Sequence, residues 1–151
     1  MNEGTVIKEV VIEAPAAKVW EAITNKVAMK QWYFDLAEFR PEVGFEFQFE
    51  GGDETRTFLH LCEITEVIPE EKLTHSWSYD GFPGKSFVTW ELFDEGGATR
   101  VKLTHTGLET FPETNPSFAW KNFEAGWNDI VCTLLKNYVE KTLAEKQPQT
   151  A

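Results

Sequence analysis

Apolar and polar residues alternate with a period of two along several short stretches of this chain. The stretch 45–50 alternates phenylalanine with glutamate and glutamine, and the same pattern runs through residues 72–79, 86–93 and 99–105. A period of two places every second side chain on one face of a β-strand. Glycine, proline and aspartate separate these stretches, so we predict short strands that hairpins join into one broad antiparallel sheet.

Three further stretches extend the predicted sheet. Residues 5–13 are rich in Val and Ile and end at Ala14–Pro15, which predicts a first strand. A short strand is predicted over residues 36–40. The long strand predicted over 56–67 has apolar residues in two opposite registers, which a β-bulge would explain, and Gly51–Asp53 is the predicted hairpin before it.

Apolar residues three and four positions apart predict helices near both ends of the chain. Two short helices are expected over 16–24 and 26–31, where Pro15 suits a first helical turn and Asn25 separates the two. A long amphipathic helix is expected over 117–145. Its inward stripe is predicted to hold Trp120, Phe123, Trp127, Val131, Leu134 and Tyr138.

These elements define an α+β fold class, in which the long helix covers the apolar face of the sheet. A single helix about 10 Å wide does not fill the hollow of a broad, curved sheet. Large side chains or a bound molecule must therefore fill the remaining space, and the 12 Phe, 6 Trp and 3 Tyr of the chain are compatible with either.

Several short motifs follow one another in a characteristic order. Ala14-Pro15 precedes Val19-Trp20, the late strand reads TRVKLTHTG from Thr99 to Gly107, and Gly126-Trp127 lies in the last helix. In this order the motifs resemble the START-like, helix-grip superfamily, also called SRPBCC. Within it, the chain looks similar to small bacterial proteins that resemble the C-terminal domain of the activator of heat-shock protein 90 ATPase.

The resemblance implies one START-like domain over residues 1–151, with a curved antiparallel sheet wrapped around a long C-terminal helix and two short helices after the first strand. It also implies a ligand cavity between the sheet and that helix. The side chains that it places on the cavity wall are Trp32, Phe45, Phe47, Phe49, His75, Trp77, Val88, Trp90, Leu103, His105, Trp127, Val131, Leu134 and Tyr138. The hydrophobic pattern supports one apolar face and leaves open whether that face is hollow or packed. The glycine-rich segment 80–85 is predicted to be a mobile loop at the entrance.

Polar side chains on this apolar face are the candidates for chemistry. His75 and His105 share the face of their apolar neighbours, so each is either a ligand or acid–base residue or a structural histidine bonded to a backbone carbonyl. Tyr138 offers a hydroxyl that either orients a ligand or simply reaches water at an edge. His60 and Cys62 share a strand face, but the sequence supplies no further metal ligands beside them.

Composition removes several classes of function. The net charge of −11, without a basic patch, disfavours nucleic acid and anionic membranes as partners. No nucleophile elbow, phosphate-binding loop or dinucleotide motif is present, so neither a cofactor nor a metal is predicted. The two cysteines suggest no disulfide framework, and no apolar run reaches the roughly 18 residues of a membrane span. We therefore expect a cytoplasmic protein without membrane insertion.

Three functions remain as hypotheses. The first is the binding of a small hydrophobic or amphipathic molecule in the implied cavity. The second, which the resemblance implies, is a chaperone cofactor of the heat-shock protein 90 ATPase activator type, with a protein chaperone as partner. The third is a cyclase or hydrolase that uses His105, His75 and Tyr138 in the same cavity. The sequence leaves open whether the protein is a monomer or a homodimer.

Overall fold

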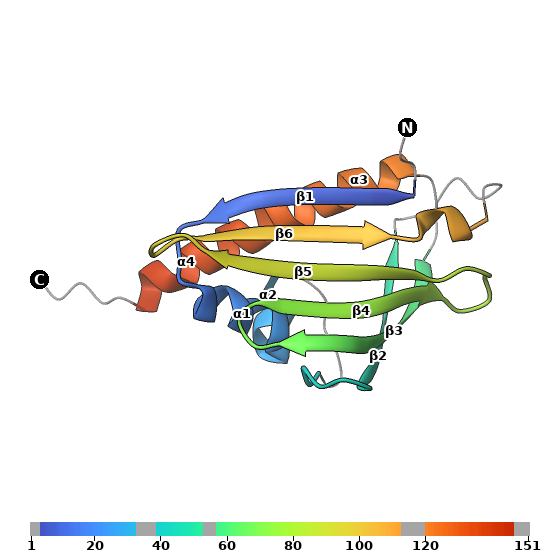
Figure 1. Ribbon diagram of the computed structural model, residues 1–151, viewed down its shortest axis with the longest axis horizontal. Coiled ribbons are helices and arrows are strands. Elements are labelled where there is room, and N and C mark those ends of the chain that lie inside the picture. The colour runs from blue at the N-terminus through green and yellow to red at the C-terminus, as the bar shows by residue number, and fades with distance from the viewer. Residues whose placement is uncertain (1–3, 33–38, 53–56, 113–119, 147–151) are drawn as a thin grey trace, which may run out of the picture.

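A computed structural model describes residues 4–32, 39–52, 57–112 and 120–146 of the chain. The described strands form one six-stranded antiparallel sheet in the order β1-β6-β5-β4-β3-β2 (Figure 1). Their bounds are Thr5–Ile12 for β1, Glu46–Gly52 for β2, Thr57–Ile68 for β3, Lys72–Tyr79 for β4, Ser86–Asp94 for β5 and Thr99–Thr106 for β6. The curved antiparallel sheet and its C-terminal helix confirm the α+β, helix-grip fold class.

The strand boundaries agree with the alternating pattern except around β2. This strand continues through Gly52, which pairs with Thr57, so the predicted turn does not begin at Gly51. Residues 53–56 lie outside the described part of the chain. The predicted strand over 36–40 is not observed at Phe39 and Arg40, and residues 36–38 are not described.

β3 contains the predicted bulge. Its pairing with β4 shifts register between Ile64 and Glu66, which brings both Ile64 and Val67 toward the core. The neighbouring ladder is also altered, because the backbone N–H of Glu63 donates to the hydroxyl of Ser76, at 2.9 Å. The register shift therefore explains why Val67 reaches the core although it lies in the register opposite to Phe58 and Ile64. Leu59 and Leu61 precede the bulge and stay on the other face of the strand.

Two short helices follow β1, as predicted: α1 spans Ala16–Thr24 and α2 spans Lys26–Trp32. Asn25 separates the two helices because it caps the end of α1 and the start of α2. Its N–H donates to the carbonyl of Glu21, and its side-chain oxygen accepts the N–H groups of Val27 and Ala28.

The long C-terminal helix has three parts: α3 over Trp120–Asp129, a π-helical segment, η3, over Ile130–Leu135, and α4 over Lys136–Lys146. Its buried apolar side chains are four positions apart: Phe123, Trp127, Val131, Leu135 and Val139. A π-helical turn contains more residues than an α-turn, so the inward face moves along the sequence. The prediction that Leu134 faces the interior is therefore wrong, since its side chain is 45% exposed and Leu135 is buried instead.

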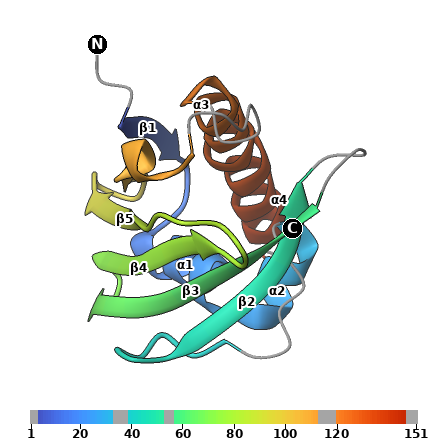
Figure 2. The same cartoon turned by 90° about the vertical axis from the view of Figure 1, so that its right-hand side faces the viewer.

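The same helix covers the free edge of β1. The Trp120 indole N–H donates to the carbonyl of Thr5, at 2.7 Å, and the Lys136 ammonium donates to that of Val11, at 3.1 Å. Side chains thus satisfy carbonyl groups that an edge strand otherwise exposes to another chain. Figure 2 shows α3 and α4 alongside the inner face of the curved sheet.

The glycine-rich segment between β4 and β5 is fixed at one end. The hydroxyl of Thr110, in the short 3₁₀ helix η1 (Leu108–Thr110), accepts the N–H of Lys85 at 2.9 Å. Gly84 lies against the carbonyl of Thr110, where a Cβ would approach to 2.5 Å, and its φ is +108°. These contacts leave the Lys85 end of the segment little freedom to move as a gate.

Candidate functional site

The interior between the sheet and the helices is filled with rings around Trp77. Four aromatic side chains lie at ring-centroid distances of 4.8 Å (His60), 5.3 Å (His105), 5.4 Å (Trp127) and 5.7 Å (Phe49) from it. They come from β2, β3, β6 and α3, so elements distant in the sequence build one aromatic core. Ring packing of this kind contributes to stability beyond the area that it buries.

A chain of hydrogen bonds crosses this core. The Trp127 indole N–H donates to Nδ1 of His105, at 2.9 Å, and Nε2 of His105 lies 2.7 Å from the hydroxyl of Ser86. That hydroxyl donates to the carbonyl of Trp77, at 2.9 Å. This chain of hydrogen bonds links α3 to β6, β5 and β4.

The proton positions in the chain follow from its two ends. An indole N–H only donates and a carbonyl only accepts. Nδ1 of His105 is therefore unprotonated, and Nε2 carries the proton and donates to Ser86. Burial, helped by neighbouring His75 and His60, lowers the pKa of His105 to about 3, which keeps the ring neutral. Because both nitrogens are occupied, this arrangement leaves neither of them available as an acid or a base.

His75 differs in that only one of its ring nitrogens has a hydrogen-bond partner among the described residues. Its Nδ1 lies 2.9 Å from the carbonyl of Ser76, which can only accept, so Nδ1 carries the proton. Burial lowers the pKa of His75 to about 4, partly offset by this bond. The ring is therefore neutral, and Nε2 is a buried acceptor to which no described residue donates.

A small apolar pocket lies beside His75. Residues from α1, α2, β2, β4 and β5 enclose it together with Phe39, and its lining is Ile23, Met29, Trp32, Phe39, Phe47, Leu73, His75 and Trp90. Its volume is about 10 Å³. A volume of about 10–15 Å³ is the minimum for a single water molecule. In this conformation, the pocket is closed to any larger molecule.

A third histidine belongs to the same core. His60 stacks on Phe49, with 4.6 Å between the ring centroids, and its Nδ1 lies 2.9 Å from the carbonyl of Phe58. Burial lowers the pKa of His60 to about 4. From the sequence, His60 was only a weak metal candidate beside Cys62. Its even spacing from Phe58 and Cys62 on the strand was the available signal that it faces inward.

The structure places the predicted wall residues in three groups. Most are buried in the aromatic core: Trp32, Phe47, Phe49, His75, Trp77, Val88, Trp90, Leu103, His105, Trp127 and Val131. Phe45 is half-buried at the edge of the core, and Tyr138 lines a separate pocket of about 20 Å³ between α1, α2 and α4. Leu134 is exposed.

Some lining residues of the His75 pocket were not among the predicted site residues. These are Ile23, Met29, Phe39 and Leu73. The hydrophobic pattern already placed Met29 on the inner face of the second helix and Leu73 on the inner face of its strand. Only Phe39 had no such signal, because it follows a segment without regular alternation.

A larger hollow, of about 500 Å³, lies on the outer side of the sheet over β2, β3 and β4. Its floor includes Ser76 and Ser78, and longer side chains, among them Glu46, Glu63 and Lys85, surround them. This lining is mostly polar and charged. It suits a hydrophobic ligand less well than the inner pocket does.

No group of three or more His, Cys, Asp or Glu side chains in the described part of the chain is placed to hold a metal ion. No described helix is both long enough and apolar enough to cross a membrane.

The family model described as "Activator of Hsp90 ATPase homolog 1-like protein" matches residues 13–140. No curated protein matches the chain.

Several solved structures have the same fold. DynU16, a putative protein in the dynemicin biosynthetic locus, is 25% identical with a TM-score of 0.72; the match covers 97% of this chain but only 49% of DynU16. This chain therefore spans about half the length of that protein. Protein CV1439 from Chromobacterium violaceum is 20% identical with a TM-score of 0.76. The match covers 91% of this chain and 97% of CV1439. Protein BH1534 from Bacillus halodurans (25% identity, TM-score 0.70) is covered completely by 93% of this chain.

Proposed function

Because this chain belongs to the family of Activator of Hsp90 ATPase homolog 1-like proteins, we propose that it binds a small amphipathic molecule in the pocket beside His75. The ligand is expected to have an apolar body and one hydrogen-bond donor. The residues that would contact it are the apolar lining of that pocket and Nε2 of His75. Of the cavity wall predicted from the sequence, this proposal keeps only the residues of the pocket near α1 and α2: Trp32, Phe47, His75 and Trp90.

One observation carries this proposal: the buried acceptor at His75. A buried polar atom without a partner costs about 1–3 kcal/mol of stability. A hydroxyl or N–H group of a ligand would recover that cost, while an apolar body would replace the contacts of the surrounding rings. A ligand without a donor would gain nothing at this atom, so the site would select for amphipathic molecules.

The small volume of the pocket requires that binding be coupled to a rearrangement. Trp32 is restrained, because its indole N–H donates to the carbonyl of Ala22 at 2.9 Å. Met29 is a long, flexible side chain without a polar anchor, and methionine adapts readily to a changed shape. We infer that Met29 moves aside first and that its displacement opens the pocket toward α2.

A thermal-shift screen of small amphipathic compounds tests the proposal. A ligand at 100 times its dissociation constant adds about 2.7 kcal/mol. For a domain of this size, each kcal/mol raises the midpoint by about 2–4 °C, so a true ligand should raise it by about 5–11 °C. A hit should lose at least tenfold in affinity in His75→Gln, which displaces the acceptor.

The matched pair Met29→Ala and Val27→Ala provides the control on α2. Met29→Ala enlarges the pocket and should strengthen binding or admit larger ligands, whereas Val27 is exposed and its substitution should leave affinity unchanged. If a hit binds equally well to the wild type, His75→Gln and Met29→Ala, it occupies another site, and the proposed pocket is wrong.

The family description favours one alternative, a chaperone cofactor. The partner would then be a chaperone ATPase with a basic surface, since this chain carries a net charge of −11. Sedimentation of the mixed proteins at low salt, followed by an ATPase assay, tests this function independently of the pocket. Absence of both association and ATPase stimulation would remove it.

A further inference from the structure

The outer face of β1, β6, β5 and β4 is not covered by any described helix. Figure 1 shows these strands side by side toward the viewer, with α3 and α4 behind them. We call this surface the outer face. Its apolar side chains Ile7, Val11, Phe87 and Phe93 are between 36% and 53% exposed.

The strand register places one row of alternating charge across this face. Glu9 pairs with Lys102, Lys102 pairs with Glu91, and Glu91 pairs with Lys72. The row therefore reads negative, positive, negative, positive from β1 to β4. Read from β4 to β1, the row is positive, negative, positive, negative. A second copy whose row runs in the opposite direction would therefore place an opposite charge against each charge of the first.

The charge balance of the outer face differs from that of the whole chain. The chain has 25 acidic and 14 basic side chains. The outward positions of these four strands carry Glu9 and Glu91 against Lys72, Lys102 and Arg100, and with the adjoining Glu66 and Glu95 the charges are nearly balanced. The net charge of −11 makes two copies repel each other, and a face of nearly balanced charge reduces that repulsion.

The two central charges of the row are available for a partner. Arg100 pairs with Glu9 and Glu95, and Lys72 pairs with Glu66. Lys102 and Glu91, by contrast, form no ion pair within the described part of the chain. They stand at the middle of the row, on β6 and β5.

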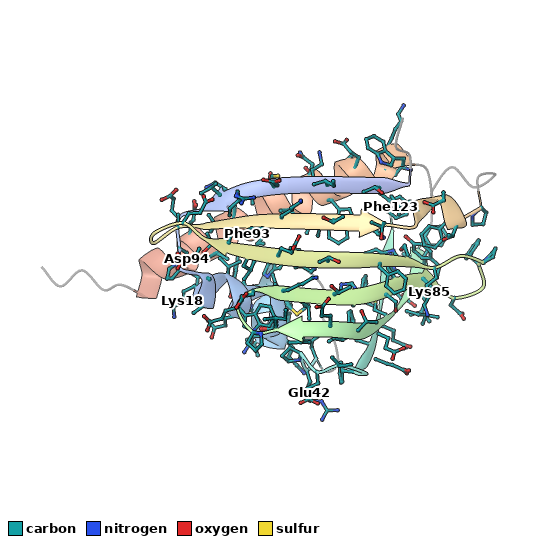
Figure 3. The ribbon with its side chains drawn as sticks, viewed as in Figure 1. Lys18, Glu42, Lys85, Phe93, Asp94 and Phe123 are labelled. Atoms are coloured by element: carbon teal, nitrogen blue, oxygen red, sulfur yellow. The ribbon has the colours of Figure 1, made fainter. Side chains whose placement is uncertain are left out.

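We propose that the outer face binds a second copy of this chain through a two-fold axis that runs along the strands between β6 and β5. This axis places Lys102 of each copy opposite Glu91 of the other, and Glu9 of each opposite Lys72 of the other. It also brings Phe93, which Arg100 covers at 4.4 Å, opposite the other copy's Arg100. Figure 3 labels Phe93 on this face. The contact is isologous, as closed two-fold dimers require.

The size of the face indicates a weak dimer. Four strands about 4.8 Å apart and about 27 Å long cover about 500 Å² per copy. Stable interfaces bury about 800 Å² per partner. We therefore expect a dissociation constant of about 10⁻⁵–10⁻³ M, so that dimers form only at high local concentration.

Analytical ultracentrifugation from about 10 μM to 1 mM, at about 0.15 M salt to screen the net charge, tests the proposal. The wild type should show a concentration-dependent monomer–dimer equilibrium. Lys102→Glu and Glu91→Lys should each weaken it at least tenfold, because each places like charges opposite one another. The double variant restores opposite charges across the axis and should return to within about threefold of the wild type.

An equimolar mixture of the two single variants gives the sharpest result. In a mixed dimer, positions 91 and 102 are both acidic in the Lys102→Glu copy and both basic in the Glu91→Lys copy. Opposite charges therefore face each other at both positions, so the mixture should associate more strongly than either variant alone. Lys141→Glu makes the same charge change on α4, away from the outer face, and should not alter the equilibrium. A wild type that is monomeric at 1 mM, or a mixture that gains no association, would overturn the proposal.

Discussion

At the scale of single residues, the buried histidines are the most informative feature of this protein. His60, His75 and His105 surround Trp77, and burial holds all three rings in the neutral state. For His105, the hydrogen-bond chain also fixes which nitrogen carries the proton. His105 belongs to a hydrogen-bonded network within an aromatic core, and such networks are stabilising only when their members are satisfied.

Removing the Trp127 indole N–H, the first donor of the hydrogen-bond chain through His105, should lower the stability of the protein. Trp127→Phe leaves Nδ1 of His105 without a donor in the interior, which costs about 1–3 kcal/mol. Trp120→Phe is the control, because its indole bonds the carbonyl of half-buried Thr5, where water can replace it. Urea unfolding should show a larger loss for Trp127→Phe. Equal losses, or ¹⁵N shifts that place the proton of His105 on Nδ1, would contradict the assigned chain.

The lowered pKa values predict a defined pH dependence. The three histidines titrate near pH 6.5 when unfolded but near 4, 4 and 3 in the folded protein. Between these values the unfolded state binds more protons, so the free energy of unfolding falls as the pH drops below about 6.5. Each histidine contributes up to about 1.4 kcal/mol per pH unit.

Urea unfolding at pH 7, 6 and 5 measures this dependence. In His75→Gln the slope between pH 6 and 5 should fall by about a third, because one of the three titrating groups is gone. A free energy of unfolding that stays constant from pH 7 to 5 would show that the histidines are not held neutral by the fold.

At the scale of elements, the π-helical segment η3 decides which face of the C-terminal helix is buried. Leu135→Ala should cost about 2–5 kcal/mol, because it removes a fully buried side chain. Leu134→Ala, one position earlier, should change stability by less than about 0.5 kcal/mol. Thermal or urea unfolding compares the two. A larger loss of stability for Leu134→Ala than for Leu135→Ala would instead support the burial of Leu134 that the sequence predicted.

The C-terminal helix also protects the sheet. Side chains of Trp120 and Lys136 occupy carbonyls along the edge of β1. This arrangement makes a new strand at that edge unfavourable, since the added strand would have to displace them. The proposed contact between copies through the outer face would leave these hydrogen bonds intact.

At the scale of the whole molecule, the interior is packed rather than hollow in the described conformation. The family relationship and the buried acceptor of His75 both support ligand binding, and the pocket volume of about 10 Å³ requires that ligand binding open the core. A closed core that opens for its ligand implies slow association. The charge distribution adds a second feature, because a strongly acidic molecule has one nearly balanced face.

The sequence alone predicted the order and type of the described strands and α-helices, apart from the strand expected over 36–40 and the π-helical segment. Alternating phenylalanines in 45–50 and the amphipathic pattern after residue 120 predicted an α+β fold, and the resemblance carried by the ordered motifs, such as Ala14-Pro15, implied the helix-grip arrangement. These signals are local, because hydrophobic periodicity reports which side of a strand or helix faces the core. The bulge in β3 was also predictable, because it left Val67 in the register opposite to Phe58 and Ile64.

Only the tertiary structure decided how the inward residues are used. The burial of Leu135 rather than Leu134 depends on a π-turn, and periodicity calculated for an α-helix does not detect it. The proton on His105 depends on Trp127 and Ser86, which lie far from it in the sequence. Whether rings fill a cavity or line it depends on distances between elements. Composition and spacing carry no information on those distances, so the sequence predicted an apolar face but not its packing.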